Sequence, residues 1–185
     1  SNCGCDYAAV HFPGASLDEL NESARALLPT DKLCYPLPRR GERFPAVKPD
    51  AERFVTAEPR DPTEHFAMYL QGVAFVERWS YETIRDLGGS WGGTVFTSGG
   101  GARSDVWMQL RADALGCPVA RTNAPDSAFG AAVLAASRTL HGNVVDAARA
   151  MVSVDRVFDP RPELSAQYAA LYAAFRRACA DRGMT

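Results

Sequence analysis

The stretch Thr97-Ser98-Gly99-Gly100-Gly101-Ala102-Arg103-Ser104-Asp105 decides the fold class, because it joins a short β-rich run at 94–97 to a helical pattern. Three successive glycines let the backbone turn sharply and let a ligand approach the amide groups within hydrogen-bonding distance. The helix that starts at Ser104 adds free N–H donors and a partial positive charge, which together attract anions. The stretch matches neither the P-loop nor the Gly-x-Gly-x-x-Gly pattern. Taken alone, it predicts either a nucleotide phosphate site or a tight strand-to-helix connection.

The elements around this turn predict an α/β fold. After the helix from Ser104, residues 118–121 form the next predicted strand, and an alanine-rich helix opens at Asp126 or Ser127. The order over residues 94–140 is therefore strand, glycine turn, helix, strand, helix. This order is typical of an α/β unit.

The longest helical pattern lies before the turn, over residues 66–87, with Asp61 or Thr63 as its cap and Gly88-Gly89 as its stop. The other predicted elements are a helix over 15–28 capped by Ser16, short strands at 32–38 and 53–57, a loop at 39–50, and an amphipathic helix from Pro160 preceded by Asp159. Proline and glycine breaks are concentrated before Thr63, so the N-terminal third is expected to be more irregular.

Composition limits the range of functions. The chain has 185 residues, of which 46% are hydrophobic, and this suits a single globular domain covering residues 1–185. Its 20 basic and 22 acidic side chains give a net charge of -2, which argues against a nucleic-acid partner. No apolar run approaches the ~20 residues that a membrane span needs, so no membrane partner is expected.

The five cysteines and three histidines do not form a metal-binding pattern. There is no Cys-x-x-Cys, the histidines lie far apart in the sequence, and Cys3-Gly4-Cys5 lacks a second cluster. An odd number of cysteines in a chain of this size favours free thiols and a reducing, cytoplasmic location. The chain begins Ser1-Asn2 without a methionine, so residues 1–2 are interpreted as the remnant of a cleaved tag.

Several motifs in a fixed order carry a family resemblance. The block SGGGARSDVWMQLRADALGCPV at 98–119, followed by AFGAAVLAA at 128–136, closely resembles the C-terminal half of FGGY-family carbohydrate kinases. The loop LPRRGERFP at 37–45 resembles the Gly-Glu-Arg-Thr-Pro loop of the xylulokinase-like branch, and QGVA at 71–74 resembles the family's Glu-Gly-Val-Ala helix. The resemblance covers more than half of the chain, from about Leu33 to Ala136.

The resemblance implies a fold and an activity. The expected fold is an actin-like (ribonuclease-H-like) ATPase domain, with a mixed sheet flanked by helices. The expected role is that of the nucleotide-binding C-terminal half of a two-domain kinase that transfers the γ-phosphoryl group of ATP to a sugar or polyol hydroxyl.

The resemblance also implies which residues contact the nucleotide. In such kinases the glycine turn lines the ATP site, so Gly99, Gly100, Gly101 and Ala102 are predicted to face the adenosine and the α-phosphate, and Asp105 to reach the adenine end. ATP with Mg²⁺ is the implied cofactor, and no residue of this chain is predicted to be a metal ligand. The substitution Gly101→Val is predicted to abolish nucleotide binding while leaving the far-UV circular dichroism spectrum almost unchanged.

Other residues of the shared motifs keep two interpretations. Arg103 and Ser104 match the family consensus, but a surface charge and a helix cap explain them equally well. We interpret Trp107 as a core residue and Asp113 as a structural hydrogen-bond partner.

The loop and the long helix also depart from the family pattern. Glu42 and Arg43 fit either a loop ion pair or domain contact, or a direct substrate or nucleotide role. The segment AERFVTA at 51–57 lacks the two glycines that usually follow the loop, and Tyr69 stands where the helix normally carries a small residue. The identity of the sugar is therefore not predicted.

The family motifs that carry catalysis do not occur in this chain. The Asp-x-Gly-Thr phosphate hairpin and the Gly-Asp of the catalytic base both precede the matched region in the family, so no residue is predicted to be catalytic. Asp6, Asp18 and Asp31 are acidic candidates by position only, and none is assigned the role of base. The chain alone is predicted to be inactive, with ATP or ADP as partner and the sugar bound together with the missing N-terminal domain.

One further expectation concerns the surface. An apolar face that the missing domain would cover should be exposed, which favours self-association as a homo-oligomer.

Two alternatives to a carbohydrate kinase stay open. The first is a different actin-like ATPase, such as an activator ATPase or a glucokinase-like enzyme, which would share the glycine turn. The second is a non-catalytic binding module, which would keep the fold and lose the nucleotide site.

Overall fold

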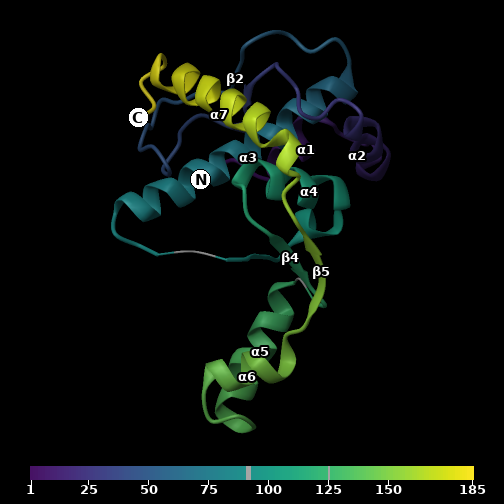
Figure 1. The fold of residues 1–185 in the computed structure, drawn as a ribbon, viewed down its shortest axis with the longest axis vertical. Coiled ribbons are helices and arrows are strands. Elements are labelled where there is room, and N and C mark those ends of the chain that lie inside the picture. Colours follow the sequence, from purple (N-terminus) through teal and green to yellow (C-terminus); the bar gives the residue numbers. More distant parts are fainter. Residues whose placement is uncertain (91–92, 125) are drawn as a thin grey trace.

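A computed structural model describes residues 1–90, 93–124 and 126–185 of the chain (Figure 1). In that part of the chain the helices are α1 (Asp6–His11), α2 (Leu17–Arg25), α3 (Pro62–Asp86), α4 (Asp105–Leu115), α5 (Ser127–Thr139), α6 (Val144–Met151) and α7 (Ser165–Ala180). The strands are β1 (Cys34–Tyr35), β2 (Phe54–Val55), β3 (Val95–Thr97), β4 (Val119–Thr122) and β5 (Val154–Phe158). Short 3₁₀ turns span Gly100–Arg103 and Pro162–Leu164.

The long helix α3 organises the main core. It begins at Pro62 and is capped by Asp61, whose carboxylate accepts a hydrogen bond from the Glu64 amide at 2.8 Å, as the cap prediction requires. Helices α2 and α4 and strand β1 pack against it, and its Phe75 makes aromatic contacts with Tyr172 and Phe175 of α7. Figure 1 shows α3 crossing the body of the molecule between these elements.

Gly72 lets β1 lie directly on α3. A Cβ atom at this position would be 2.2 Å from the Cys34 carbonyl oxygen, so any side chain would collide with backbone. The neighbouring Gln71 is also buried, and its amide group bonds both the N–H and the carbonyl of Thr30, at 3.0 and 2.8 Å. The QGVA motif therefore fixes the N-terminal region on the long helix.

The second sheet carries the glycine turn. Its strand order is β3-β4-β5, with β3 and β4 parallel and β4 and β5 antiparallel, so the predicted mixed sheet is confirmed. Val95, Val119 and Phe158 lie in one row on the face that packs against Met108 and Ala112 of α4.

The opposite face of this sheet is partly open. The neighbouring row consists of Phe96, Ala120 and Val157, and 63% of Phe96 is exposed.

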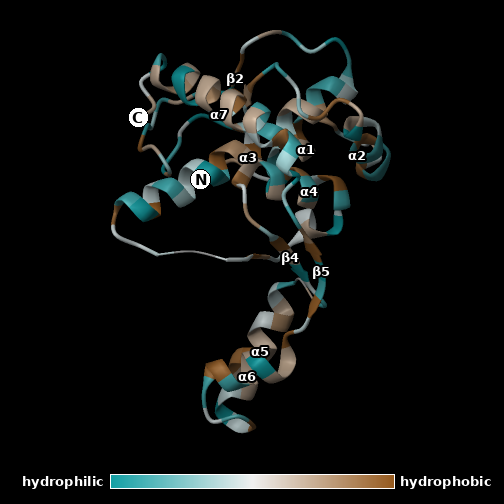
Figure 2. Ribbon diagram, in the orientation of Figure 1, coloured by the Kyte–Doolittle hydropathy of each residue, from teal (hydrophilic) through white to brown (hydrophobic). Residues whose placement is uncertain are grey.

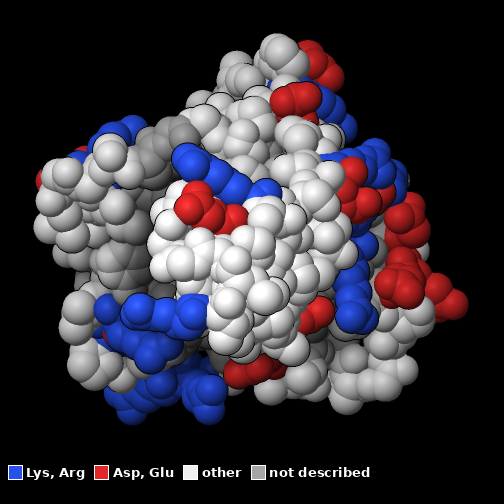
Figure 3. Space-filling model, turned by 90° about the horizontal axis from the view of Figure 1, so that it is seen from below, with Lys and Arg blue, Asp and Glu red and all other residues white. Residues whose placement is uncertain are grey.

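Helices α5 and α6 form an arm that projects from the sheet (Figure 1). The two helices pack chiefly against each other, and Leu134, Leu140, Val144 and Val145 are exposed on them. Figure 2 shows hydrophobic segments along this arm, and Figure 3, which views the molecule from below, shows a largely uncharged surface there with basic and acidic groups around it. Apolar side chains are therefore exposed on the arm, and their coverage by another domain stays a prediction.

The C-terminal helix begins later than predicted. It starts at Ser165, after the 3₁₀ turn, and not at Pro160. The reason is tertiary: Gln109 donates to the Asp159 carbonyl at 2.8 Å, and Arg161 binds Asp113 through its backbone N–H and its side chain. These contacts hold the preceding segment in an extended conformation.

Three elements were not predicted from the sequence, namely α1, α6 and β5. In the described part of the chain, no helix combines the length and apolar character of a membrane span.

Candidate functional site

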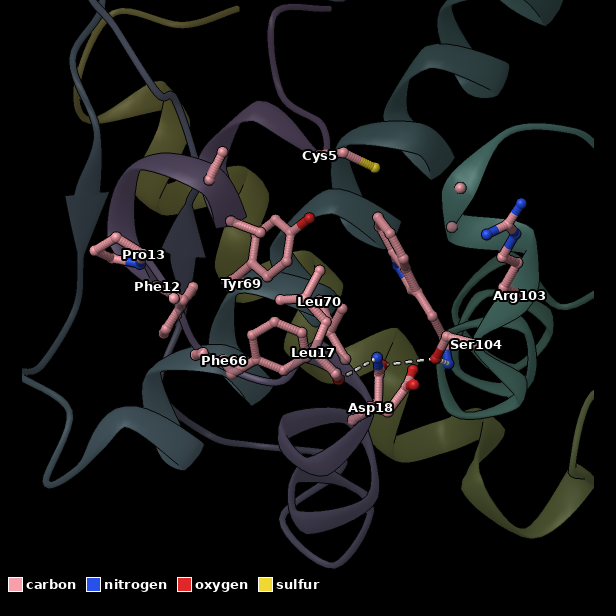
Figure 4. A pocket seen from close by; sticks show the side chains of 18 residues that line it. Cys5, Phe12, Pro13, Leu17, Asp18, Phe66, Tyr69, Leu70, Arg103 and Ser104 are labelled. Carbon is pink, nitrogen blue, oxygen red and sulfur yellow. Dashed lines mark hydrogen bonds between the residues drawn. The ribbon is translucent and has the colours of Figure 1, made fainter. Parts of the chain in front are cut away.

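A cavity of about 730 Å³ lies beside the glycine turn (Figure 4). One wall comes from α1, the start of α2 and the loop between them, and includes Ala9 and Phe12. Tyr69 and Leu70 of α3 line it between the two sides, and the opposite wall comes from the turn and the start of α4. Figure 4 shows Arg103 and Ser104 on the side opposite Phe12 and Pro13. Three segments that are distant in sequence therefore come together to form the cavity.

The geometry of the turn depends on its glycines. Gly99 has a φ of 92°, in the left-handed region that favours glycine, and the 3₁₀ turn follows it. A Cβ atom at Gly100 would meet nothing within 4 Å, whereas a Cβ at Gly101 would lie 2.7 Å from the Trp107 ring. The open side of Gly100 is thus available to a ligand, and Gly101 allows the turn to pack on Trp107.

Ser104 connects the turn to both helices of the site. Its hydroxyl oxygen accepts a hydrogen bond from the Trp107 amide at 3.1 Å, so its interpretation as the α4 cap is confirmed. The same hydroxyl donates to Asn21 Oδ1 of α2 at 2.6 Å, and Asn21 Nδ2 donates to the Leu17 carbonyl at 2.7 Å (dashed lines in Figure 4). This pair places polar atoms on a wall that is otherwise mainly apolar.

The predicted nucleotide residues occupy different positions around the cavity. Gly100 and Gly101 line it. Gly99 precedes the lining residues, and Ala102, within the turn, has a fully buried side chain. Asp105 is engaged by two arginines: Arg121 lies 2.8 Å from one carboxylate oxygen, and Arg156 binds the other. The contact of these residues with a nucleotide remains a prediction.

Arg103 is the basic residue among those that line the cavity. Its side chain is exposed, and it makes no ion pair with any residue that the structure describes. A free guanidinium at the rim of a cavity next to backbone amides adds positive charge where an anion would bind.

The wall formed by α1 is held by a cluster of aromatic rings that the sequence did not reveal. Tyr7 stacks on His11 and on Tyr69, with ring centroids 4.0 and 5.1 Å apart, and its hydroxyl lies 2.8 Å from His65 Nε2. Burial and the nearby Arg53 lower the pKa of His11. Burial, His11 and Arg53 together lower the pKa of His65, against a smaller opposing effect of Glu58.

This cluster is stable in the neutral form of both imidazoles. It could have been anticipated only from the spacing of Tyr7 and His11, which lie one helical turn apart.

Glu42, in the loop at 37–45, is held by hydrogen bonds from other groups of this chain. It is buried and accepts hydrogen bonds from the Tyr35 hydroxyl at 2.9 Å, the Arg43 amide at 2.9 Å, the Ser1 hydroxyl at 2.7 Å and the Asn2 amide at 2.8 Å. Burial raises the pKa of the Glu42 carboxyl, but these hydrogen bonds outweigh it and the net shift is downward. The loop is therefore fixed by a buried carboxylate, whose oxygens are occupied by this chain's own groups.

Two interpretations of core residues are confirmed. Asp113 has a fully buried side chain that binds Arg161 at 2.7 and 3.0 Å and accepts from Gln109 at 3.1 Å. Trp107 is 9% exposed and packs in the main core, although one side of it also lines the cavity.

The structure gives Gly101→Val an expected effect on packing that the sequence did not reveal, and its effect on nucleotide binding stays a prediction. A branched side chain at this position would collide with the buried Trp107 ring, so the substitution would disturb packing as well as any ligand. The adjacent Gly100 is the position where a side chain enters open space.

Comparison with known proteins identifies the family. Residues 7–139 match the model of the FGGY family of carbohydrate kinases, C-terminal domain, and the chain belongs to this family. The prediction of the family is thus confirmed, and the alternative of a different type of actin-like ATPase is wrong.

The relatives agree in class. The chain is 29% identical over 134 residues to a xylulose kinase of Bacillus subtilis (strain 168), covering 70% of this chain and 27% of the relative. It is 43% identical over 63 residues to a glycerol kinase of Bordetella parapertussis, covering 34% of this chain and 12% of the relative. The chain therefore spans about a quarter or less of the length of these curated relatives.

Solved structures share the fold. A xylulose kinase from Rhodospirillum rubrum matches with a TM-score of 0.74 and 27% identity over 95% of this chain and 36% of its own. A ligand-bound xylulose kinase from Lactobacillus acidophilus matches with a TM-score of 0.81 and 19% identity, covering 97% of this chain and 38% of its own. The predicted actin-like ATPase fold is confirmed.

Proposed function

We propose that the cavity binds the nucleotide of a carbohydrate kinase, and that the whole protein transfers the γ-phosphoryl group of ATP to a hydroxyl of a sugar or polyol. One observation carries the proposal: the exposed side of the glycine turn and the start of α4 open into a cavity of about 730 Å³ with aromatic and aliphatic walls. Pockets of roughly 300–1,000 Å³ are typical of small-molecule sites. Names of the relatives supply the acceptor class, a sugar or a polyol.

The two ends of a nucleoside phosphate match two parts of this cavity. The amides of Gly100 and Gly101 and the exposed guanidinium of Arg103 favour phosphate oxygens. Phe12 and the 46% exposed Leu17 offer the kind of apolar surface on which a base packs. Gly99 supports this arrangement by its left-handed conformation, and Ala102 by the burial of its side chain on the far side of the turn from the ligand.

Polar recognition of the base belongs to the start of α4. Ser104 and Asn21 present a hydroxyl and an amide at the wall. Asp105 is absent from the lining of the cavity, and both of its carboxylate oxygens bind arginines, so its contact with the adenine end stays a prediction from the family resemblance alone.

Mg²⁺ is proposed to arrive with the phosphates of ATP. Among the residues that the structure describes, no group of three His, Cys, Asp or Glu side chains could hold a metal ion. Asp18 is the carboxylate among the described lining residues, and it lies at the start of α2. We assign it no role as base, and we propose that the sugar-binding and base-supplying groups lie in sequence outside this chain.

The same proposal extends to location and partners. A kinase that uses ATP works where ATP is kept, in the cytoplasm, and the five free thiols fit a reducing compartment. The chain alone is expected to bind nucleotide weakly and to phosphorylate no sugar, because further contacts to the nucleotide and the groups that bind the sugar are proposed to lie outside this chain.

Calorimetric titration with ADP and with ATP plus Mg²⁺ tests the proposal. The wild-type chain should bind ADP in the millimolar range, and Gly100→Val should lose this binding because its side chain occupies open space beside the turn. Gly130→Val is the matched control, since Gly130 of α5 also has nothing within 4 Å of an added Cβ and lies on the arm. No heat with the wild-type chain at millimolar ADP, or equal binding by the Gly100→Val variant, would overturn the proposal.

A further inference from the structure

Arg111 of α4 links three elements behind the glycine turn. Its Nε and Nη2 donate to the two oxygens of Glu77 on α3, at 2.7 and 2.6 Å, and its Nη1 donates to Thr97 Oγ1 at 2.7 Å. The side chains of Arg111 and Glu77 are only 12% and 19% exposed. Thr97 is buried and is the last residue of β3, directly before the turn. The bidentate contact fixes the plane of the guanidinium, so the third contact has a defined direction.

The turn itself has few contacts of its own. The Ala102 amide donates to the Gly99 carbonyl at 3.1 Å, and the Ser104 amide donates to the Gly101 carbonyl at 3.3 Å. A side chain added at Gly99 or Gly100 would meet no atom within 4 Å, so no packing surrounds the turn on that side. On its other side the turn packs on Trp107, and Arg121 Nη1 donates to the Ala102 carbonyl at 3.3 Å, so it is the path through Gly99 and Gly100 that depends on how the entry to the turn is held.

We propose that Arg111, oriented by Glu77, is a positioning residue for nucleotide binding, acting by anchoring Thr97 at the entry to the glycine turn. The inference rests on the proposed function of the cavity. Arg111 is absent from the cavity lining, so its effect passes through the position of the Gly100 and Gly101 amides. Lysine would not replace it, because an ammonium cannot hold Glu77 bidentately and reach Thr97 with a fixed fork.

The alternative is that the ion pair serves only to join α3 to α4. Arg78 provides a matched control for that role. It is also half-buried and bridges the same two helices, with Nε on Glu82 at 3.1 Å and Nη1 on the Ala114 carbonyl at 3.1 Å, and neither contact involves β3. If Arg111 only joined the two helices, replacing Arg111 and replacing Arg78 would affect the turn to the same extent.

The test compares Thr97→Val, Arg111→Met and Arg78→Met in the 185-residue chain. Thr97→Val removes the contact with Arg111 and keeps the ion pair, so it remains informative if Arg111→Met fails to fold. Two readouts are needed: amide hydrogen exchange at Ala102 and Ser104 in the nucleotide-free protein, and the dissociation constant for ADP. Thr97→Val and Arg111→Met should speed exchange at both amides and weaken ADP binding about tenfold, the effect of losing one charged hydrogen bond. Arg78→Met should leave both readouts near the wild-type values.

The outcomes separate this inference from the proposed function. Wild-type exchange rates at Ala102 and Ser104 in both Thr97→Val and Arg111→Met would overturn the role of Arg111, whether or not ADP binds. Faster exchange without any change in ADP affinity would overturn it as well, as would an equal effect of Arg78→Met. Failure of the wild-type chain to bind ADP would instead reject the nucleotide cavity itself.

Discussion

Two adjacent glycines of the turn should respond in opposite ways to the same substitution. An alanine at Gly101 would place its Cβ 2.7 Å from Cζ3 and 3.0 Å from Cε3 of Trp107, closer than real Cβ atoms come to other atoms. An alanine at Gly100 would meet nothing within 4 Å, and the φ angle at Gly100 is not in the left-handed region. The comparison therefore isolates steric fit at the turn from the general effect of replacing glycine.

The magnitude follows from how firmly the Trp107 ring is held. Trp107 is 9% exposed, and its ring lies 5.8 Å from that of Tyr69, centroid to centroid, so it has little room to retreat. Overpacking of this kind costs about 1–3 kcal/mol. Gly100→Ala should change the free energy of unfolding by less than about 0.5 kcal/mol or stabilise slightly, because it only restricts the unfolded chain.

Urea denaturation followed by far-UV circular dichroism measures both free energies of unfolding. Gly101→Ala should unfold at a lower urea midpoint than the wild type, with an unchanged slope, and Gly100→Ala should not. If Gly101→Ala proved as stable as Gly100→Ala, the close packing of the turn on Trp107 would be refuted.

Two further predictions concern parts of the core that support the cavity. The histidines of the α1 wall have pKa values below the ordinary value near 6.5, so the unfolded chain binds more protons and the free energy of unfolding should fall as the pH drops below about 6.5. His65→Gln should flatten this dependence in denaturation curves between pH 8 and 5, and a slope equal to that of the wild type would contradict the assignment. Gly72→Ala should lower the free energy of unfolding by about 3 kcal/mol, because its Cβ would lie 2.2 Å from a backbone oxygen of β1, and a variant of wild-type stability would show that β1 does not rest on α3 in this way.

Local chemistry made much of the fold predictable. The caps Ser16, Asp61, Ser104 and Asp126 each accept a hydrogen bond from an amide three residues later, so the signal and its structural effect lie in the same short segment. The same holds for Gly116, whose φ of 71° ends α4. Helix starts and stops could thus be predicted without tertiary information.

The remaining elements depend on contacts between distant segments. Helix α1 has only six residues and owes its position to rings from α3. Strand β5 is exposed along most of its length and exists because β4 offers it a free edge. The start of α7 was wrongly predicted at Pro160 because the sequence does not show that Arg161 is held by Asp113, 48 residues away.

The candidate site likewise has one part that is continuous in sequence and another part that joins distant segments. The glycine turn and its helix were visible in the sequence as one continuous stretch, and the resemblance to the family supplied their predicted role. The opposite wall and the Arg111 anchor join residues far apart in the chain, such as Phe12 with Gly101 and Glu77 with Arg111. No local pattern could have paired them.

The central claim is that the glycine turn and the α1 wall together form a nucleotide cavity. The most direct measurement is an NMR titration with ADP that follows each backbone amide. The amides of Gly100, Gly101 and Ser104 and that of Ala9 on the facing wall should shift together with one dissociation constant, while Gly130 on the arm stays fixed. Saturating ADP that moved only amides outside the turn and α1, or none at all, would contradict the claim.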